Sequence, residues 1–132
     1  ENMANDSVMI MDMMGGGDCY IEDHVDKRRI KKGKNGFSYH WRQVSFNPVN
    51  ANALFRIDFR FQDGSRIKGA FEYDWRFWTI PEVREMLSEA GFRESHVYWE
   101  LEDEDEEDTG IWQRGHDAIS HASWVCYLVA VK

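Results

Sequence analysis

Apolar and polar side chains alternate through the middle of the chain. Apolar residues take nearly every second position from Phe37 to Trp41, from Phe55 to Phe61 and from residue 67 to residue 73. A period of two is typical of strands that bury one face. Turn-forming residues separate the three segments at 47–50 (Asn-Pro-Val-Asn) and at 62–64 (Gln-Asp-Gly). The pattern therefore predicts a three-stranded antiparallel β-meander over residues 37–73.

The second turn also predicts the register of the meander. A two-residue loop at 63–64 would place Phe61 opposite Arg66 and mix apolar and charged side chains on one face. A three-residue loop with a left-handed Gly64 keeps the apolar residues on one face, so we expect that loop. Its cross-strand pairs would be Phe59 with Ile67, Phe55 with Phe71, and Asp58 with Lys68.

Two further segments are apolar on both alternating faces. The first, Ser7 to Met14, predicts a strand covered on both sides, as in a parallel α/β sheet, and it stops at three glycines. The second, Ala122 to Val131, predicts a central strand. Residues 18–36 are polar, charged and glycine-containing, which indicates a loop with at most one helical turn.

Thr79 to Gly91 carries the clearest helical signal. Thr79 and Glu82 have the spacing of a capping box, and Pro81 is tolerated in a first turn. Gly91 is a typical C-terminal stop. One apolar stripe follows the helical period, made of Val83, Met86, Leu87 and Ala90. Ser95 to Leu101 then predicts a strand.

Composition and charge limit the class of protein. The 132 residues, 42% hydrophobic and 30% charged, suit one globular domain or part of one. The longest apolar run, Trp124 to Val131, is far shorter than the roughly 20 residues of a membrane-spanning helix, so we expect no membrane partner. Cys19 and Cys126 lie far apart without a paired motif, which favours a reduced, cytoplasmic chain.

The charge is concentrated in two short runs. Eight of the nine residues from Glu100 to Asp108 are acidic and account for the whole net charge of −8. They predict a solvated acidic loop over residues 100–110. A basic run at 27–34 contains no aromatic residue, so we expect a mobile loop there and no nucleic-acid partner.

Metal and phosphate motifs are weak. His116, His121 and Cys126 are spaced by five, but a strand between the last two would point them to opposite faces, so we expect no metal site. Cys126 has no polar neighbour in its predicted strand and is expected to be a buried packing thiol. The glycines at 15–17 lack the GxGxxG spacing, and they indicate the end of a strand.

The segment Phe71 to Trp78 has five aromatic residues in eight. It could be an aromatic plug between the meander and the helix. It could also be a substrate wall, with Tyr73 and Trp78 as apolar surfaces and Arg76 as the anchor of a carboxylate or phosphate.

Three motifs together resemble a known family. They are D-x-x-G-G at 12–16, Y-D-W-R-F-W-T-I-P-E-V-R-E-M-L-S-E-A-G-F at 73–92 and H-V-Y-W-E at 96–100. The chain resembles, over nearly its whole length, the C-terminal half of a class I S-adenosylmethionine-dependent methyltransferase. The Y-D-W-R-x-W extension is similar to a branch with an inserted β-meander.

The resemblance implies an α/β fold, the C-terminal part of a Rossmann-like sheet with strand order 3-2-1-4-5-7-6. Residues 1–132 would form a single partial domain with the meander inserted at 37–73. Ser7 to Met14 would be strand five, Thr79 to Gly91 the last helix and Ser95 to Leu101 strand six. Ala122 to Val131 would be strand seven, antiparallel and between the other two.

The resemblance also implies functional residues and partners. S-adenosylmethionine would be the cofactor of the complete enzyme and a small molecule its methyl acceptor. Because the glycine-rich cofactor loop and the acidic ribose-binding residue are missing, we expect no cofactor and no activity for this chain alone. The candidate residues are Asp12, His40 and Tyr73 for catalysis, and Trp41, Arg76 and Trp78 for substrate binding.

A second hypothesis remains open, a free-standing, non-enzymatic module that binds a ligand or partner on an aromatic-lined sheet. The chain begins at Glu1 in place of methionine, which favours a processed product or a piece of a longer protein. With strand five exposed, we also expect a homo-oligomer.

Overall fold

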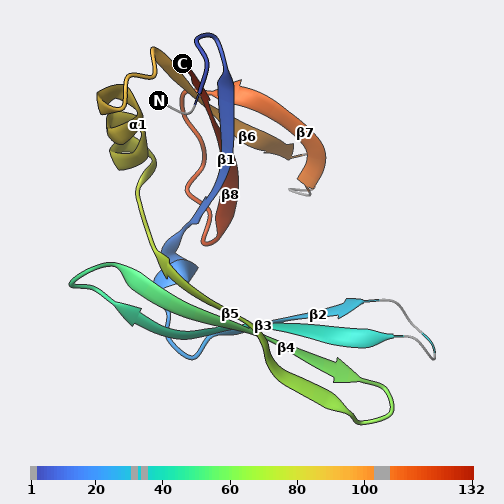
Figure 1. Ribbon diagram of the computed structural model, residues 1–132. Coiled ribbons are helices and arrows are strands. Elements are labelled where there is room, and N and C mark those ends of the chain that lie inside the picture. The colour runs from blue at the N-terminus through green and yellow to red at the C-terminus, as the bar shows by residue number, and fades with distance from the viewer. Residues whose placement is uncertain (1–2, 31–32, 34–35, 103–107) are drawn as a thin grey trace. The chain divides into compact units, whose positions relative to one another are not determined.

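The computed structural model describes residues 3–30, 33, 36–102 and 108–132 (Figure 1). The chain divides into two compact units. One comprises residues 1–16 and 78–132, and the other comprises Gly17–Phe77. Each unit contains one four-stranded antiparallel sheet. No helix in the described part of the chain has the length and apolarity needed to cross a bilayer.

The sheet of the first unit has the order β1-β8-β6-β7. Its strands are β1 (Val8–Gly15), β6 (Glu94–Glu102), β7 (Asp108–Gly115) and β8 (Trp124–Val131). β8 lies between β1 and β6 and is antiparallel to both, so β1 and β6 run in the same direction on either side of it. The prediction that residues 122–131 form a central strand is therefore confirmed.

The helix of this unit, α1 (Ile80–Glu89), begins as the sequence predicts. The Thr79 hydroxyl accepts a hydrogen bond from the Glu82 amide, and the Glu82 carboxylate accepts one from the Thr79 amide at 2.7 Å. The helix packs Val83 and Leu87 onto the sheet. The buried residues Leu128 and Ala130 form the sheet side of this core, which extends over Met9, Met11, Met13, Phe92 and Val97.

On the opposite face, the part formed by β1 and β8 is largely apolar and exposed, with Asp12 among its side chains, whereas the β6 part carries Glu94 and His96. Strand alternation places Val8, Ile10, Val125 and Tyr127 there, and Ile10 is 66% exposed. Within the described residues, β1 pairs only with β8, so the other edge of β1 has unpaired backbone groups. This sheet thus has one packed face, one bare apolar face and one open apolar edge strand.

The sheet of the second unit has the order β2-β3-β4-β5. The strands are β2 (Val25–Ile30), β3 (Phe37–Asn47), β4 (Asn52–Phe61) and β5 (Arg66–Arg76), and a short 3₁₀ helix, η1 (Gly17–Tyr20), precedes them. The predicted three-residue loop at 62–64 is confirmed. The Phe61 amide donates to the Ser65 carbonyl at 3.0 Å, and Gly64 has a φ of +85°.

The register of the meander is only partly as predicted. Phe59 lies opposite Ile67 as expected, but Phe55 lies opposite Tyr73 in place of Phe71. The cause is an irregularity between Ile57 and Phe59. At this point Asp58 is not paired with Lys68, as was expected. Its carboxylate accepts a hydrogen bond from the Gly69 amide at 2.7 Å.

The predicted α/β, Rossmann-like fold class is wrong, because the chain is mostly β and both its sheets are antiparallel. The segment expected to be an inner parallel strand is the edge strand β1. An apolar run has the same pattern whether or not both faces are covered, and here one face is bare. The meander has a fourth strand, β2, because residues 25–30 extend along β3 where a loop was predicted.

The acidic run lies mostly outside the described residues. β6 extends to Glu102 and β7 begins at Asp108, so residues 103–107 of the predicted 100–110 loop are not described. The sequence did not predict β7, whose residues lack a clear alternating pattern. The Lys31, Lys32 and Lys34 part of the basic run is not described either.

Candidate functional site

An aromatic cluster on one face of the second sheet brings two of the predicted site residues together. Trp41 on β3 and Tyr73 on β5 stack with ring centroids 5.9 Å apart and an interplanar angle of 27°. Phe55 is on β4, between their strands, and its ring centroid lies 4.9 Å from that of Trp41. The ring centroids of Trp75 and Tyr73 are 4.6 Å apart. Cross-strand register positions these rings, since Tyr73 is paired with Phe55 and Trp41 with Ile57.

The cluster has a buried centre and an exposed margin. Phe55 is fully buried, whereas Trp75 is 41% exposed and Phe71 is 53% exposed. Offset and edge-to-face contacts of this kind add about 0.5–1.5 kcal/mol per pair beyond area burial. The cluster therefore stabilises the sheet and also presents aromatic surface to a ligand, so both readings of the segment Phe71 to Trp78 stay open.

Tyr39 borders this cluster and was not predicted as a site residue. Burial, followed by the neighbouring Tyr73, raises the pKa of the Tyr39 phenol. The phenol therefore keeps its proton at neutral pH and can donate a hydrogen bond to a ligand. The alternation of residues 37–41 placed Tyr39 on the aromatic face, so a signal for it was present in the sequence.

His40 lies on the opposite face of the same sheet. It is buried, and its Nε2 atom is 3.0 Å from the Ser38 hydroxyl. Burial lowers the pKa of His40, and Arg60, Lys27 and Arg42 lower it further while Asp58 opposes them. Its imidazole is therefore neutral at pH 7, but it does not share a face with Tyr73.

The remaining candidates lie on the other face of this sheet or belong to the first unit. Arg76 is paired with Asn52, and strand alternation places it on the face opposite Tyr73. Asp12 and Trp78 belong to the first unit, where Asp12 lies opposite Tyr127 on the bare apolar face. Of the six predicted residues, Trp41 and Tyr73 are in contact.

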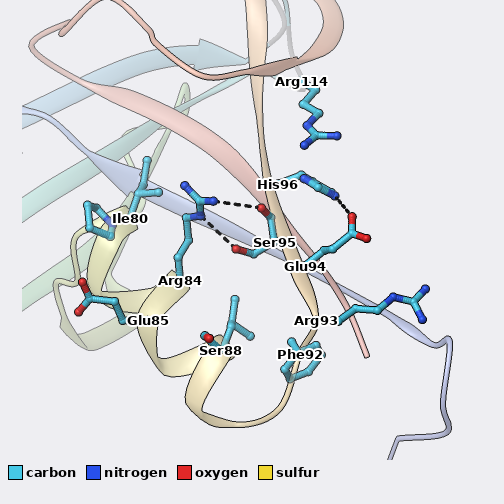
Figure 2. A pocket seen from close by; sticks show the side chains of 12 residues that line it. Ile80, Arg84, Glu85, Ser88, Phe92, Arg93, Glu94, Ser95, His96 and Arg114 are labelled. Carbon is cyan, nitrogen blue, oxygen red and sulfur yellow. Dashed lines mark hydrogen bonds and ion pairs between the residues drawn. The ribbon is translucent and has the colours of Figure 1, made fainter.

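A groove of about 660 Å³ in the first unit was not predicted from the sequence (Figure 2). It runs between α1 and the start of β6. The Arg84 guanidinium donates to the Ser95 hydroxyl at 3.0 Å and to the Ser95 carbonyl at 3.4 Å. His96 Nε2 lies 2.9 Å from the Glu94 carboxylate, with Arg114 nearby. These internal partners occupy much of the polar capacity of the groove.

The glycines after β1 do not form a cradle for a cofactor phosphate. A side chain at Gly15 would overlap the ring of Trp124, and one at Gly16 would overlap the Ala122 carbonyl. Both glycines are thus required for close packing against the start of β8. The residues present do not fit S-adenosylmethionine, and we derive no catalytic step through it.

Cys126 is fully buried, and burial raises its thiol pKa to about 11. The expectation of a buried packing thiol is therefore confirmed. In the described part of the chain, no three His, Cys, Asp or Glu side chains converge to hold a metal ion. The chain matches no protein-family model, no curated protein and no solved structure.

Proposed function

We propose that this chain is the C-terminal portion of an S-adenosylmethionine-dependent methyltransferase, without the cofactor-binding half and inactive alone. The order of three strands is the observation that carries the proposal. β8 lies between β1 and β6 and is antiparallel to both. The resemblance implied this order and direction for the last three strands of the family, whereas the residue pattern predicted only that residues 122–131 form a central strand.

The bare face and open edge of β1 also support the proposal. An edge strand usually carries lysine, proline or a bulge that discourages pairing, and β1 has none of these before Gly15. Val8 and Ile10 project from the bare face and are more than half exposed. A further segment of the complete enzyme would pair this edge and cover this face.

The second sheet has a separate role in the proposal. Its aromatic cluster, centred on Trp41, Phe55 and Tyr73, forms an apolar wall that covers a small methyl acceptor. Methyl transfer depends mainly on aligning the acceptor, so a rigid aromatic surface is well suited to this task. The same surface and the open β1 edge also support self-association into a homo-oligomer.

Cofactor binding tests the proposal. The coding sequence upstream of Glu1 should encode a strand, a glycine-rich loop and a helix. In isothermal titration calorimetry, the longer product should bind S-adenosylmethionine with micromolar affinity, roughly −8 kcal/mol, and the 132-residue chain should not. Micromolar binding by the 132-residue chain would contradict the proposal, as would an upstream sequence without that loop.

The aromatic cluster favours a second candidate function, a non-enzymatic module that binds a ligand or partner on this face. Trp75 and Phe71 are exposed at the margin of the cluster. The two functions differ in whether ligand binding requires a segment upstream of this chain. Ligand binding by the isolated chain, without any upstream segment, would favour the module.

A further inference from the structure

Three arginines form a row across the non-aromatic face of the second sheet. The register pairs Arg29 on β2 with Ser38 on β3, Ser38 with Arg60 on β4, and Arg60 with Arg66 on β5. Neighbouring strands are about 4.8 Å apart, so the row spans about 14 Å. All three arginines are exposed, and Ser38 contributes a hydroxyl between two of them.

Another pair of arginines on this face differs from the row because each has an acidic ion-pair partner. Arg42 and Arg56 are also direct cross-strand partners. Arg42 has an ion pair with Asp58 at 3.6 Å, and Arg56 has one with Glu72 at 2.7 Å. Each cation of that pair is therefore balanced by a carboxylate.

The row has no such balance. Among the residues that the structure describes, Arg29, Arg60 and Arg66 have no ion pair with an acidic side chain. Like charges directly opposite each other destabilise a sheet. An anion bound between Arg60 and Arg66 would remove that repulsion, and two planar guanidinium forks match the oxygens of a phosphate group.

The surface around the row is hollowed. A depression of about 410 Å³ includes Arg29, Ser38 and Arg60 in its lining. A smaller one of about 120 Å³ includes Arg60, Arg66 and Lys68. Arg60 lines both hollows, so the row has space for a ligand on either side of this residue.

The distribution of acids on this face indicates the size of the ligand. Asp58 lies next to the row and lines the smaller hollow, but its carboxylate is already engaged by Arg42 and the Gly69 amide. Glu72 and Asp74 lie farther along β5. A long polyanion that followed the strands would meet Glu72 and Asp74, whereas a compact anion at the row would not. The arrangement therefore favours a single phosphate group over a polynucleotide.

We propose that Arg29, Ser38, Arg60 and Arg66 form a binding site for a phosphate monoester or another compact phosphate-bearing ligand. The site lies on the face opposite the aromatic cluster and does not depend on the methyltransferase proposal. Arg60 and Arg66 hold the phosphate oxygens from adjacent strands, and Arg29 and Ser38 contact the ligand from the other side of Arg60.

The test uses the whole chain with inorganic phosphate as the probe. Titration followed by ¹H–¹⁵N NMR should give saturable shifts of the Arg60 and Arg66 amide signals, which sodium chloride of equal ionic strength does not reproduce. Arg60→Gln and Arg66→Gln should each weaken binding about tenfold or more, as expected for lost hydrogen bonds to a charged group. Arg66→Lys keeps the charge but loses the planar guanidinium group. Its affinity for phosphate should therefore lie between those of Arg66→Gln and the parent.

Arg56 supplies the matched control. It lies on the same strand and face as Arg60, pairs with Glu72 at 2.7 Å and lines neither hollow. Arg56→Gln removes the same charge and should leave phosphate binding unchanged, whereas Arg29→Gln should weaken it. Because Arg66→Gln also relieves the repulsion, it should raise the melting temperature without phosphate and reduce the rise that phosphate causes.

Three results would overturn the proposal. The first is equal effects of phosphate and chloride, which would show general screening only. The second is an equal loss of phosphate binding in Arg56→Gln and Arg29→Gln. The third is binding of a short single-stranded oligonucleotide far more tightly than phosphate with a steep salt dependence, which would indicate a polynucleotide surface.

Discussion

The two sheets of this protein are stabilised in different ways. The β1-β8-β6-β7 sheet has a helix on one face, where Leu128 and Ala130 are buried under Val83 and Leu87, while its other face is bare and apolar. The β2-β3-β4-β5 sheet packs aromatic rings on one face and carries charged side chains on the other. One face of the first sheet has no covering element within its own unit, whereas the second sheet carries packed aromatic rings on one face and charged side chains on the other.

This difference bears on the proposal that the chain is part of a larger enzyme. A bare apolar face with an open edge is a surface that another segment or a second copy usually covers. A sheet with one aromatic face and one charged face can exist in water with only part of its apolar surface exposed. In the proposal, the first unit therefore carries the surface that another segment or a second copy covers, and the second unit carries the surface for a ligand.

The largest expected effect is on the aromatic centre of the second sheet. Phe55→Ala should lower the free energy of unfolding by about 3–5 kcal/mol, because a fully buried ring is replaced by a cavity. Phe71→Ala, on the same face but 53% exposed, is the matched control and should cost much less. Urea unfolding followed by tryptophan fluorescence measures both, and equal losses would show that the cluster has no buried centre.

The next effect tests the end of β1 in the first sheet. Gly16 has a φ of +106°, and a side chain there would overlap the Ala122 carbonyl. Gly16→Ala should therefore cost about 1–3 kcal/mol of backbone strain, with the steric overlap in addition. Gly17→Ala is the control, since nothing lies within 4 Å of a side chain at Gly17. A neutral Gly16→Ala would contradict this packing.

A smaller effect tests the helix that covers the first sheet. Thr79→Ala removes the hydroxyl that accepts from the Glu82 amide and should cost about 1 kcal/mol. Thr79→Ser keeps the cap and should restore most of the loss. Thermal unfolding monitored by circular dichroism separates the two variants, and no difference between them would show that the cap is not used.

The smallest effect is a pH dependence in the second sheet. The pKa of His40 is lowered by burial and by Arg60, Lys27 and Arg42, so the folded state binds its proton less readily than the unfolded state. Stability should fall as the pH drops through about 6.5, the ordinary histidine value, and level off below the folded pKa. Comparing His40→Gln with the parent between pH 7.5 and pH 5.5, about one unit above and below that value, isolates this contribution.

Local chemistry made part of the fold predictable. The capping box of Thr79 and Glu82 and the left-handed Gly64 each depend on residues close in sequence, and the structure has both. The irregularity at Asp58 was not predictable, because it depends on a hydrogen bond from Gly69 eleven residues away. The environment of β1 could not be predicted either, because an apolar run has the same pattern whether one or both of its faces are covered.

The candidate site, too, was predictable only where it depends on the alternation of residues within one segment. Alternation placed Trp41 and Tyr73 on one face, and the structure brings them into contact across β4. Alternation also separates His40 from them, although the three were grouped as one site by the resemblance. The arginine row was missed because it depends on the register of four strands at once, which single segments do not encode.

The molecular mass of the chain in solution tests most directly whether the first sheet is incomplete. Multi-angle light scattering at micromolar concentration should show a dimer or a larger assembly, because the open edge of β1 and the bare face with Val8 and Ile10 should be buried against a second copy. A monomer of 15.6 kDa that unfolds cooperatively would contradict the account. The bare face would then need no cover, and the free-standing binding module would become the better explanation.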